Sequence, residues 1–168
     1  FTVTMAAMKQ VFLKFTAYNL MGKIDLIGIG LPAEGKTLEA WQRVNRFIPE
    51  TDQIRQWLPN RPNNAHKGTF GTAFIVAGSI SYTGAALLAG AAAYRAGAGL
   101  VHMAVPAPLH QVLSGQIPEA IWLSLPHENG FIASSAAGLI IDNIDKATSI
   151  LVGPGLGLQS TTREFIKQ

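Results

Sequence analysis

Glycine-rich segments beside short hydrophobic runs are the parts of this sequence whose residue types and spacing could support chemistry. The first runs from Gly30 to Thr37 (Gly-Leu-Pro-Ala-Glu-Gly-Lys-Thr) and has the spacing of a phosphate-binding loop. In such a loop backbone amides surround phosphates, while the lysine and the hydroxyl contact the terminal phosphate and magnesium. One hypothesis is therefore a nucleotide-binding module built on Gly35, Lys36 and Thr37, with Asp142 as a distant acidic candidate. The alternative is a polar interdomain linker, because so short a pattern also arises by chance.

A second glycine-rich segment extends from His66 to Gly84 around a β-branched hydrophobic run. The run ends in Ala-Gly-Ser79, and Tyr82-Thr83-Gly84-Ala-Ala then opens an expected helix. Free amides and the positive end of that helix favour an anion or an amide-bearing ring, and Ser79, Tyr82 and Thr83 are possible contributors from the loop. The structural alternative is that the glycines form tight turns and the alanine-rich helix packs closely on a sheet.

The third segment, from Val152 to Gly157 (Val-Gly-Pro-Gly-Leu-Gly), follows another hydrophobic run. It resembles a dinucleotide fingerprint only superficially, because a proline follows the first glycine and the spacing differs. We interpret it as a glycine-lined wall beside a bound nucleotide. The sequence shows no metal-ligand cluster and no Gly-x-Ser-x-Gly nucleophile motif, so neither a metal ligand nor a catalytic residue is predicted.

Alternating hydrophobic runs and helical segments position these loops. Strands are expected at 72–77, 99–105 and 148–152, and helices at 83–96, 108–114, 133–143 and from 161 onward. This βαβ pattern predicts a mostly parallel sheet flanked by helices, with ligands outside the carboxyl ends of its strands. Upstream, strands are expected at 2–5 and 23–31 with a loop at 17–22 between them, followed by helices at 37–47 and 51–58.

The composition excludes several classes of protein. The chain has 168 residues, 48% of them hydrophobic and 14% charged, which is typical of a globular α/β protein. A net charge of +3 without a lysine or arginine run argues against a nucleic-acid partner. The most apolar stretch contains Arg95 and His102 and therefore does not predict a membrane span. Without cysteine or a secretory signal, a cytoplasmic location is expected.

Several motifs follow one another in order between residues 66 and 157. They are His66-Lys-Gly-Thr-Phe-Gly71, Ala77-Gly-Ser79, Tyr82-Thr-Gly-Ala-Ala86, Arg95-x-Gly-Ala-Gly-Leu-Val101, Pro118-Glu119 and Gly153-Pro-Gly-Leu-Gly157. This series closely resembles the NAD(P)H-hydrate dehydratase family. The upstream residues Thr2-Val-Thr-Met5, Lys9, Tyr18, Gly22-Lys23 and Ile29-Gly-Leu-Pro32 look like the end of the NAD(P)H-hydrate epimerase domain of bifunctional members.

The resemblance implies a domain organisation. The expected fold is a ribokinase-like, mostly parallel sheet flanked by helices. This sheet is expected to be truncated and to be preceded by the last strands of a Rossmann-like epimerase domain. Residues 1–35 would end the epimerase domain, residues 36–64 would form a linker with junction helices, and residues 65–168 would begin the dehydratase domain.

The resemblance also implies an activity. Family members remove water from hydrated NADH and NADPH (NADHX and NADPHX) with ADP or ATP and Mg²⁺, and the epimerase half of a bifunctional, homo-oligomeric parent would use K⁺. Carried over to this chain, Gly84, Ala85, Ala86, Gly155 and Gly157 would form walls of the hydrate-binding site.

The family's catalytic aspartate is expected beyond Gln168, so the chain by itself is expected to be inactive. Two alternatives stay open: a ribokinase-like kinase acting on a vitamin or sugar, and the phosphate-loop module described above. The sequence leaves open the choice between ADP and ATP, the preferred hydrate and the oligomeric state.

Overall fold

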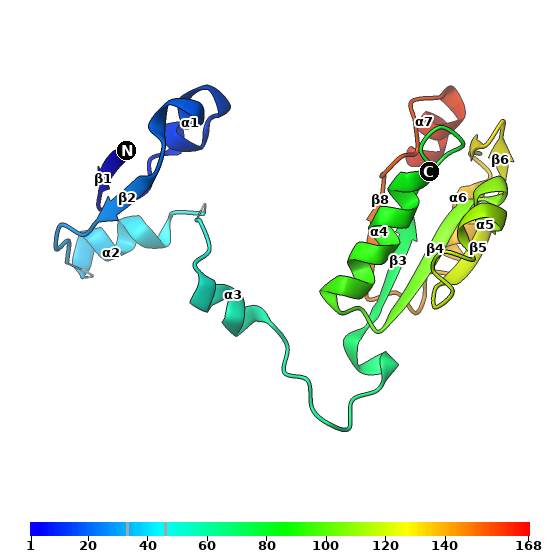
Figure 1. The fold of residues 1–168 in the computed structure, drawn as a ribbon, viewed down its shortest axis with the longest axis horizontal. Coiled ribbons are helices and arrows are strands. Elements are labelled where there is room, and N and C mark those ends of the chain that lie inside the picture. Colours follow the sequence, from blue (N-terminus) through cyan, green and yellow to red (C-terminus); the bar gives the residue numbers. More distant parts are fainter. Residues whose placement is uncertain (33, 46) are drawn as a thin grey trace. The chain divides into compact units, whose positions relative to one another are not determined.

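The computed structural model describes residues 1–32, 34–45 and 47–168, in two compact units, Phe1–Asn60 and Arg61–Gln168 (Figure 1). Ala33, inside the phosphate-loop pattern, lies outside the described residues, as does the side chain of Thr37. Within the described residues no helix is both long and apolar enough to cross a bilayer. The boundaries at residues 35 and 64 that the resemblance implies stay a prediction.

The unit Phe1–Asn60 contains a small parallel sheet. β1 (Thr2–Met5) pairs with β2 (Ile24–Ile27), and a 3-10 helix (Gln10–Leu13) and α1 (Phe15–Met21) connect them. α2 (Gly35–Gln42) and α3 (Thr51–Trp57) follow. Among the described residues of this unit only Thr4 and Met21 are buried, so its packing is sparse.

Three expectations for this unit are wrong. The strand expected at 23–31 is limited to β2 (Ile24–Ile27). The segment 17–22, expected as a loop, forms most of α1, because a single asparagine lowers helix propensity only slightly. The helix expected at 37–47 spans Gly35–Gln42 instead, with Glu34 at the N-cap position. Thr37 therefore does not cap it. Lys36 is an exposed residue of the first turn of α2.

Four parallel strands in the order β5-β4-β3-β8 form the sheet of the unit Arg61–Gln168. The strands are β3 (Thr72–Val76), β4 (Leu100–Pro106), β5 (Ile121–Leu125) and β8 (Ser149–Val152). The helices are a 3-10 helix (Lys67–Phe70), α4 (Thr83–Ala96), α5 (Ala107–Leu113), α6 (Ala136–Ile141) and α7 (Ser160–Ile166). The expected α/β fold with a parallel sheet is confirmed, and α4 has the predicted bounds. β5 was not expected.

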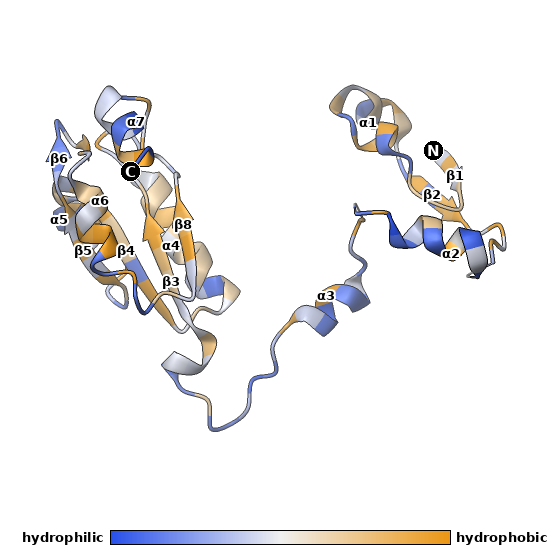
Figure 2. Cartoon of the chain, turned by 180° about the vertical axis from the view of Figure 1, so that it is seen from behind, coloured by the Kyte–Doolittle hydropathy of each residue, from blue (hydrophilic) through white to orange (hydrophobic). Residues whose placement is uncertain are grey.

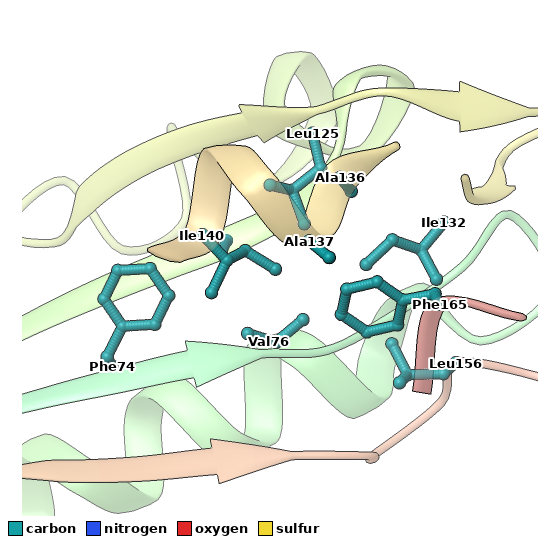
Figure 3. Close-up of a cluster of buried hydrophobic side chains, with 10 residues drawn as sticks. Phe74, Val76, Leu125, Ile132, Ala136, Ala137, Ile140, Leu156 and Phe165 are labelled. Carbon is teal, nitrogen blue, oxygen red and sulfur yellow. The ribbon is translucent and has the colours of Figure 1, made fainter. Parts of the chain in front are cut away.

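Alternating residues of the strands build one hydrophobic layer on each face of the sheet. Phe74, Val76 and Ala104 pack with α6, α7 and the segment around Leu156 on one face. Figure 3 shows Phe74 and Val76 in this cluster. Ile75 and Met103 pack with α4 and α5 on the other face. Successive side chains of a strand point to opposite faces of the sheet, and both faces are covered here. A central strand of such a sheet is therefore a continuous hydrophobic run in the sequence.

The strand β8 shows the same composition at the edge of the sheet. Figure 2 colours both β3 and β8 as hydrophobic strands. β3 is largely buried, whereas Ile150, Leu151 and Val152 of β8 are each more than 40% exposed. β8 therefore has the residues of an interior strand in an edge position.

Close backbone contacts fix the amino ends of these strands. The carbonyl of Gly71 accepts hydrogen bonds from the amides of Gly99 and Leu100, each at 3.1 Å. The hydroxyl of Thr148 accepts a hydrogen bond from the amide of Thr72 at 2.9 Å. A Cβ atom at Gly99 would collide with the carbonyl of Lys67, so only glycine fits there.

Gly99→Ala should therefore lower the free energy of unfolding of this unit by about 1–3 kcal/mol, the usual cost of overpacking. Urea denaturation followed by circular dichroism measures the change. Gly115→Ala is the control, because a Cβ atom at Gly115 would meet nothing within 4 Å. Equal effects of the two substitutions would contradict this account of the amino edge.

Candidate ligand-binding site

The loops that follow β3 and β8 meet at the carboxyl edge of the sheet. The amide of Gly78 donates to the carbonyl of Pro154 at 2.7 Å, and the amide of Gly153 donates to the carbonyl of Val76 at 3.2 Å. Gly78 has a φ of +82°, and a Cβ atom there would lie 2.7 Å from Leu109 and 3.0 Å from Ala86. Two glycine-rich segments far apart in sequence are thereby joined into one surface.

The helix α4 begins at this surface with unpaired amides. Tyr82 is its N-cap residue and makes no side-chain capping bond. The amide of Tyr82 donates to the carbonyl of Ser79 at 2.9 Å, and that of Ala85 to the carbonyl of Tyr82 at 3.3 Å. Among the hydrogen bonds of the described residues, none uses the amides of Thr83 or Gly84. These two donors can therefore bind a polar or anionic group of a ligand.

The glycines of the predicted site lack a side chain for different reasons. At Gly155 (φ +71°) a Cβ atom would lie 2.6 Å from the Cβ of Ala85 and 2.9 Å from the carbonyl oxygen of Tyr82. At Gly157 (φ +84°) it would lie 2.9 Å from the ring of Phe131. Packing thus explains both. At Gly84 a Cβ atom would meet nothing within 4 Å, so packing does not explain this glycine.

A hairpin that the sequence analysis missed borders the same loops. β6 (His127–Glu128) pairs antiparallel with β7 (Phe131–Ile132), and Asn129 and Gly130 turn the chain with φ of +51° and +80°. The amide of Ile80 donates to the carbonyl of Gly130 at 2.9 Å, which ties the hairpin to the loop after β3. The dipeptide Asn129-Gly130 is the signal that could have predicted this turn.

Among the other predicted site residues, the two alanines of α4 line the contact between the loops. Ala86 is fully buried beside Gly78, and Ala85 is half-buried beside Gly155. Ser79 is fully buried, and its hydroxyl has no hydrogen-bond partner in the part of the chain that the structure describes. Tyr82 is exposed and Thr83 half-buried. The structure brings these residues together with Gly155 and Gly157, although it does not test their roles.

The segment His66–Gly71, considered together with Gly84 in the sequence, lies at the opposite edge. It precedes β3, whereas Gly78 to Gly84 follow it, and all four strands of this sheet run parallel. The imidazole Nδ1 of His66 accepts a hydrogen bond from the amide of Gly68 at 3.1 Å, which caps a short 3-10 helix. The glycines before β3 and those after it therefore lie at opposite edges of the sheet.

Titratable groups with shifted pKa values lie away from the carboxyl edge. Burial lowers the pKa of His102, near the amino end of β4, and the positive charge of Lys146 lowers it further. Burial raises the pKa of Tyr94, in the last turn of α4, and the negative charge of Glu119 adds to this. Within the described residues no group of three or more His, Cys, Asp or Glu residues could hold a metal ion. The loops after β3 and β8 offer backbone donors and glycine surfaces.

The two kinds of glycine predict opposite changes in stability. Gly84→Ala should raise the free energy of unfolding by about 0.5–1 kcal/mol, because alanine is the better helix former and meets no obstacle. Gly155→Ala should lower it by about 1–3 kcal/mol, because a left-handed backbone strains any residue with a Cβ atom. Thermal unfolding of the two variants and of the unsubstituted 168-residue chain, called the parent chain below, tests this. Destabilisation by Gly84→Ala would show that packing does require glycine there.

Comparisons with known proteins place this arrangement in a family. Residues 73–168 match the family model described as NAD(P)H-hydrate dehydratase. A bifunctional NAD(P)H-hydrate repair enzyme of Moorella thermoacetica is 33% identical over 99% of this chain and 31% of its own length. An ADP-dependent (S)-NAD(P)H-hydrate dehydratase of Listeria monocytogenes is 35% identical over 66% of this chain and 37% of its own length.

Solved structures agree on the fold. A ribokinase-like superfamily protein from Enterococcus faecalis superposes with a TM-score of 0.59 at 25% identity, over 74% of this chain and 43% of its own. An ADP/ATP-dependent NAD(P)H-hydrate dehydratase from Bacillus subtilis, co-crystallised with ATP/Mg²⁺, gives 0.54 at 30% identity, over 69% of this chain and 39% of its own. The ribokinase-like part of the fold prediction is thereby confirmed.

The chain spans about a third of the length of the bifunctional relatives that it matches. The family model covers more than half of the chain, and it begins after the phosphate-loop pattern at residues 30–37. The resemblance stated from the motifs is confirmed, and the chain belongs to the NAD(P)H-hydrate dehydratase family.

Proposed function

We propose that the carboxyl edge of the sheet binds hydrated NADH or NADPH during its nucleotide-dependent dehydration. The observation that carries the proposal is the unpaired amides of Thr83 and Gly84 beside open space at the start of α4. Packing within the chain does not require glycine at position 84. Close approach of a ligand to the backbone does require a residue without a side chain. The parallel sheet supports the same position, because ligands bind outside the carboxyl ends of its strands.

Each part of the surface has a separate task in this proposal. The amides of Thr83 and Gly84 hold a polar group of the hydrate, and the absence of a Cβ atom at Gly84 lets the ligand lie against the helix. Gly155 and Gly157 act indirectly, because they allow the loop after β8 to pack against Tyr82, Ala85 and Phe131. Positioning rather than acid or base chemistry is what these residues contribute.

ADP or ATP, with Mg²⁺, would supply the phosphoryl group that turns the hydroxyl of the hydrate into a better leaving group. The names of the relatives from Listeria and Bacillus support a nucleotide requirement. Within the described residues no group of three or more His, Cys, Asp or Glu residues could hold Mg²⁺. In the parent protein we propose K⁺ as the cation of the epimerase half. In the parent protein we propose an additional epimerase activity, because relatives that match nearly the whole chain are bifunctional repair enzymes.

The experiment compares the binding of hydrated NADH to the parent chain and to Gly84→Ala by isothermal titration calorimetry. A methyl group on the contact surface should weaken binding by at least about tenfold, which corresponds to about 1.4 kcal/mol. Gly138→Ala is the matched control, because Gly138 is also an exposed helical glycine with nothing within 4 Å of a Cβ atom. This control should bind like the parent chain.

Two outcomes would contradict the proposal. If hydrated NADH does not bind the parent chain, the proposed substrate is wrong. If the parent chain and Gly84→Ala bind it with equal affinity, the proposed site is wrong. The longer parent protein, given ADP or ATP, distinguishes a dehydratase from a kinase, because this chain by itself is expected to be inactive. A dehydratase restores the absorbance of reduced nicotinamide, whereas a kinase leaves phosphate stably attached to an alcohol.

A further inference from the structure

The hydroxyl of Ser79 is a buried polar group that the fold leaves unused. Ser79 is fully buried between β3 and α4, and its Oγ has no hydrogen-bond partner within the described residues. An unsatisfied buried hydroxyl destabilises a folded protein, and such groups in native structures call for an explanation. The hydroxyls of two other buried residues of this unit are paired: the Oγ1 of Thr161 donates to the carbonyl of Ile132 at 3.2 Å, and the Oγ1 of Thr162 to the carbonyl of Leu156 at 3.3 Å.

The position of Ser79 connects it to the proposed site. Its carbonyl accepts the hydrogen bond of Tyr82, the N-cap residue of α4. Its Oγ lies 4.0 Å from where a Cβ atom of Gly157 would stand, and that same Cβ would touch the ring of Phe131. The hydroxyl thus faces the glycine loop whose other end, at Gly155, packs on the first turn of α4.

The surroundings of this hydroxyl favour a neutral partner. Residues 77–86 and 153–157 include no Lys, Arg, His, Asp or Glu. A phosphate buried beside Oγ would have no cation from these segments, which makes its desolvation unfavourable. A carboxamide is neutral, and its carbonyl accepts from a hydroxyl while its amino group donates to one.

We infer that Ser79 positions the ligand by pairing its Oγ with the carboxamide of the hydrated nicotinamide ring. This inference rests on the proposed function, because it names the part of the hydrate that lies beside Ser79. Since Ser79 is fully buried in the unliganded chain, the ring reaches its Oγ only when the packing around Ser79 opens. The hydroxyl of Ser79 therefore serves to bind the ligand and does not stabilise the fold.

Ser79→Ala tests the inference through two readouts that move in opposite directions. The variant should unfold at the same temperature as the parent chain or at a higher one, because it loses an unpaired polar group. It should also bind hydrated NADH about tenfold more weakly, the loss expected for one hydrogen bond to the ligand. ADP-ribose, which lacks the nicotinamide ring, should bind the variant and the parent chain equally.

Thr162→Val is the stability control, because it removes a buried hydroxyl that has a partner, and it should lower the unfolding temperature. A lower unfolding temperature of Ser79→Ala would show that the hydroxyl serves the fold and would overturn the inference. So would an equal loss of affinity for ADP-ribose, or unchanged affinity for hydrated NADH. In each of these cases the proposed function still holds if the parent chain binds hydrated NADH. If the parent chain does not bind it, the proposed function and the inference about Ser79 are both refuted.

Discussion

The pair of backbone hydrogen bonds between the loops after β3 and β8 is the constraint on which the candidate site depends. The amide of Gly78 donates to the carbonyl of Pro154, and that of Gly153 donates to the carbonyl of Val76, so the backbones of the two loops are in direct contact. This contact places Gly155 on the first turn of α4 and Gly157 beside Ser79 and Phe131. The first turn of α4 and the hydroxyl of Ser79 both lie beside this contact.

The two edges of the sheet use glycine for different purposes. At the amino edge, Gly71 and Gly99 allow backbone segments to pack closely. At the carboxyl edge, packing explains Gly78, Gly155 and Gly157, but not Gly84. A glycine-rich motif by itself therefore does not locate a binding surface. The distinction depends on what a Cβ atom would touch, and this requires coordinates.

Much of the fold could be predicted from the sequence. The hydrophobic runs at β3, β4 and β8 and the alanine-rich α4 carry strong local signals, and their alternation predicts a parallel sheet. β5 and the hairpin after it were missed, although Pro118 and Pro126 flank the strand and Asn129-Gly130 marks the turn. The hydrophobic runs of β5 and of the hairpin are short, so the local sequence pattern predicts a strand only weakly there. The pairing of loops far apart in sequence could come only from the family resemblance or from the structure.

Hydrogen–deuterium exchange of the chain with and without hydrated NADH tests the central claim most directly. A ligand at the carboxyl edge should slow exchange in residues 78–86, where the amides of Thr83 and Gly84 are unpaired, and leave residues 66–71 unchanged. Slower exchange confined to residues 66–71, or to the phosphate-loop pattern at residues 30–37, would contradict the account and place the ligand elsewhere.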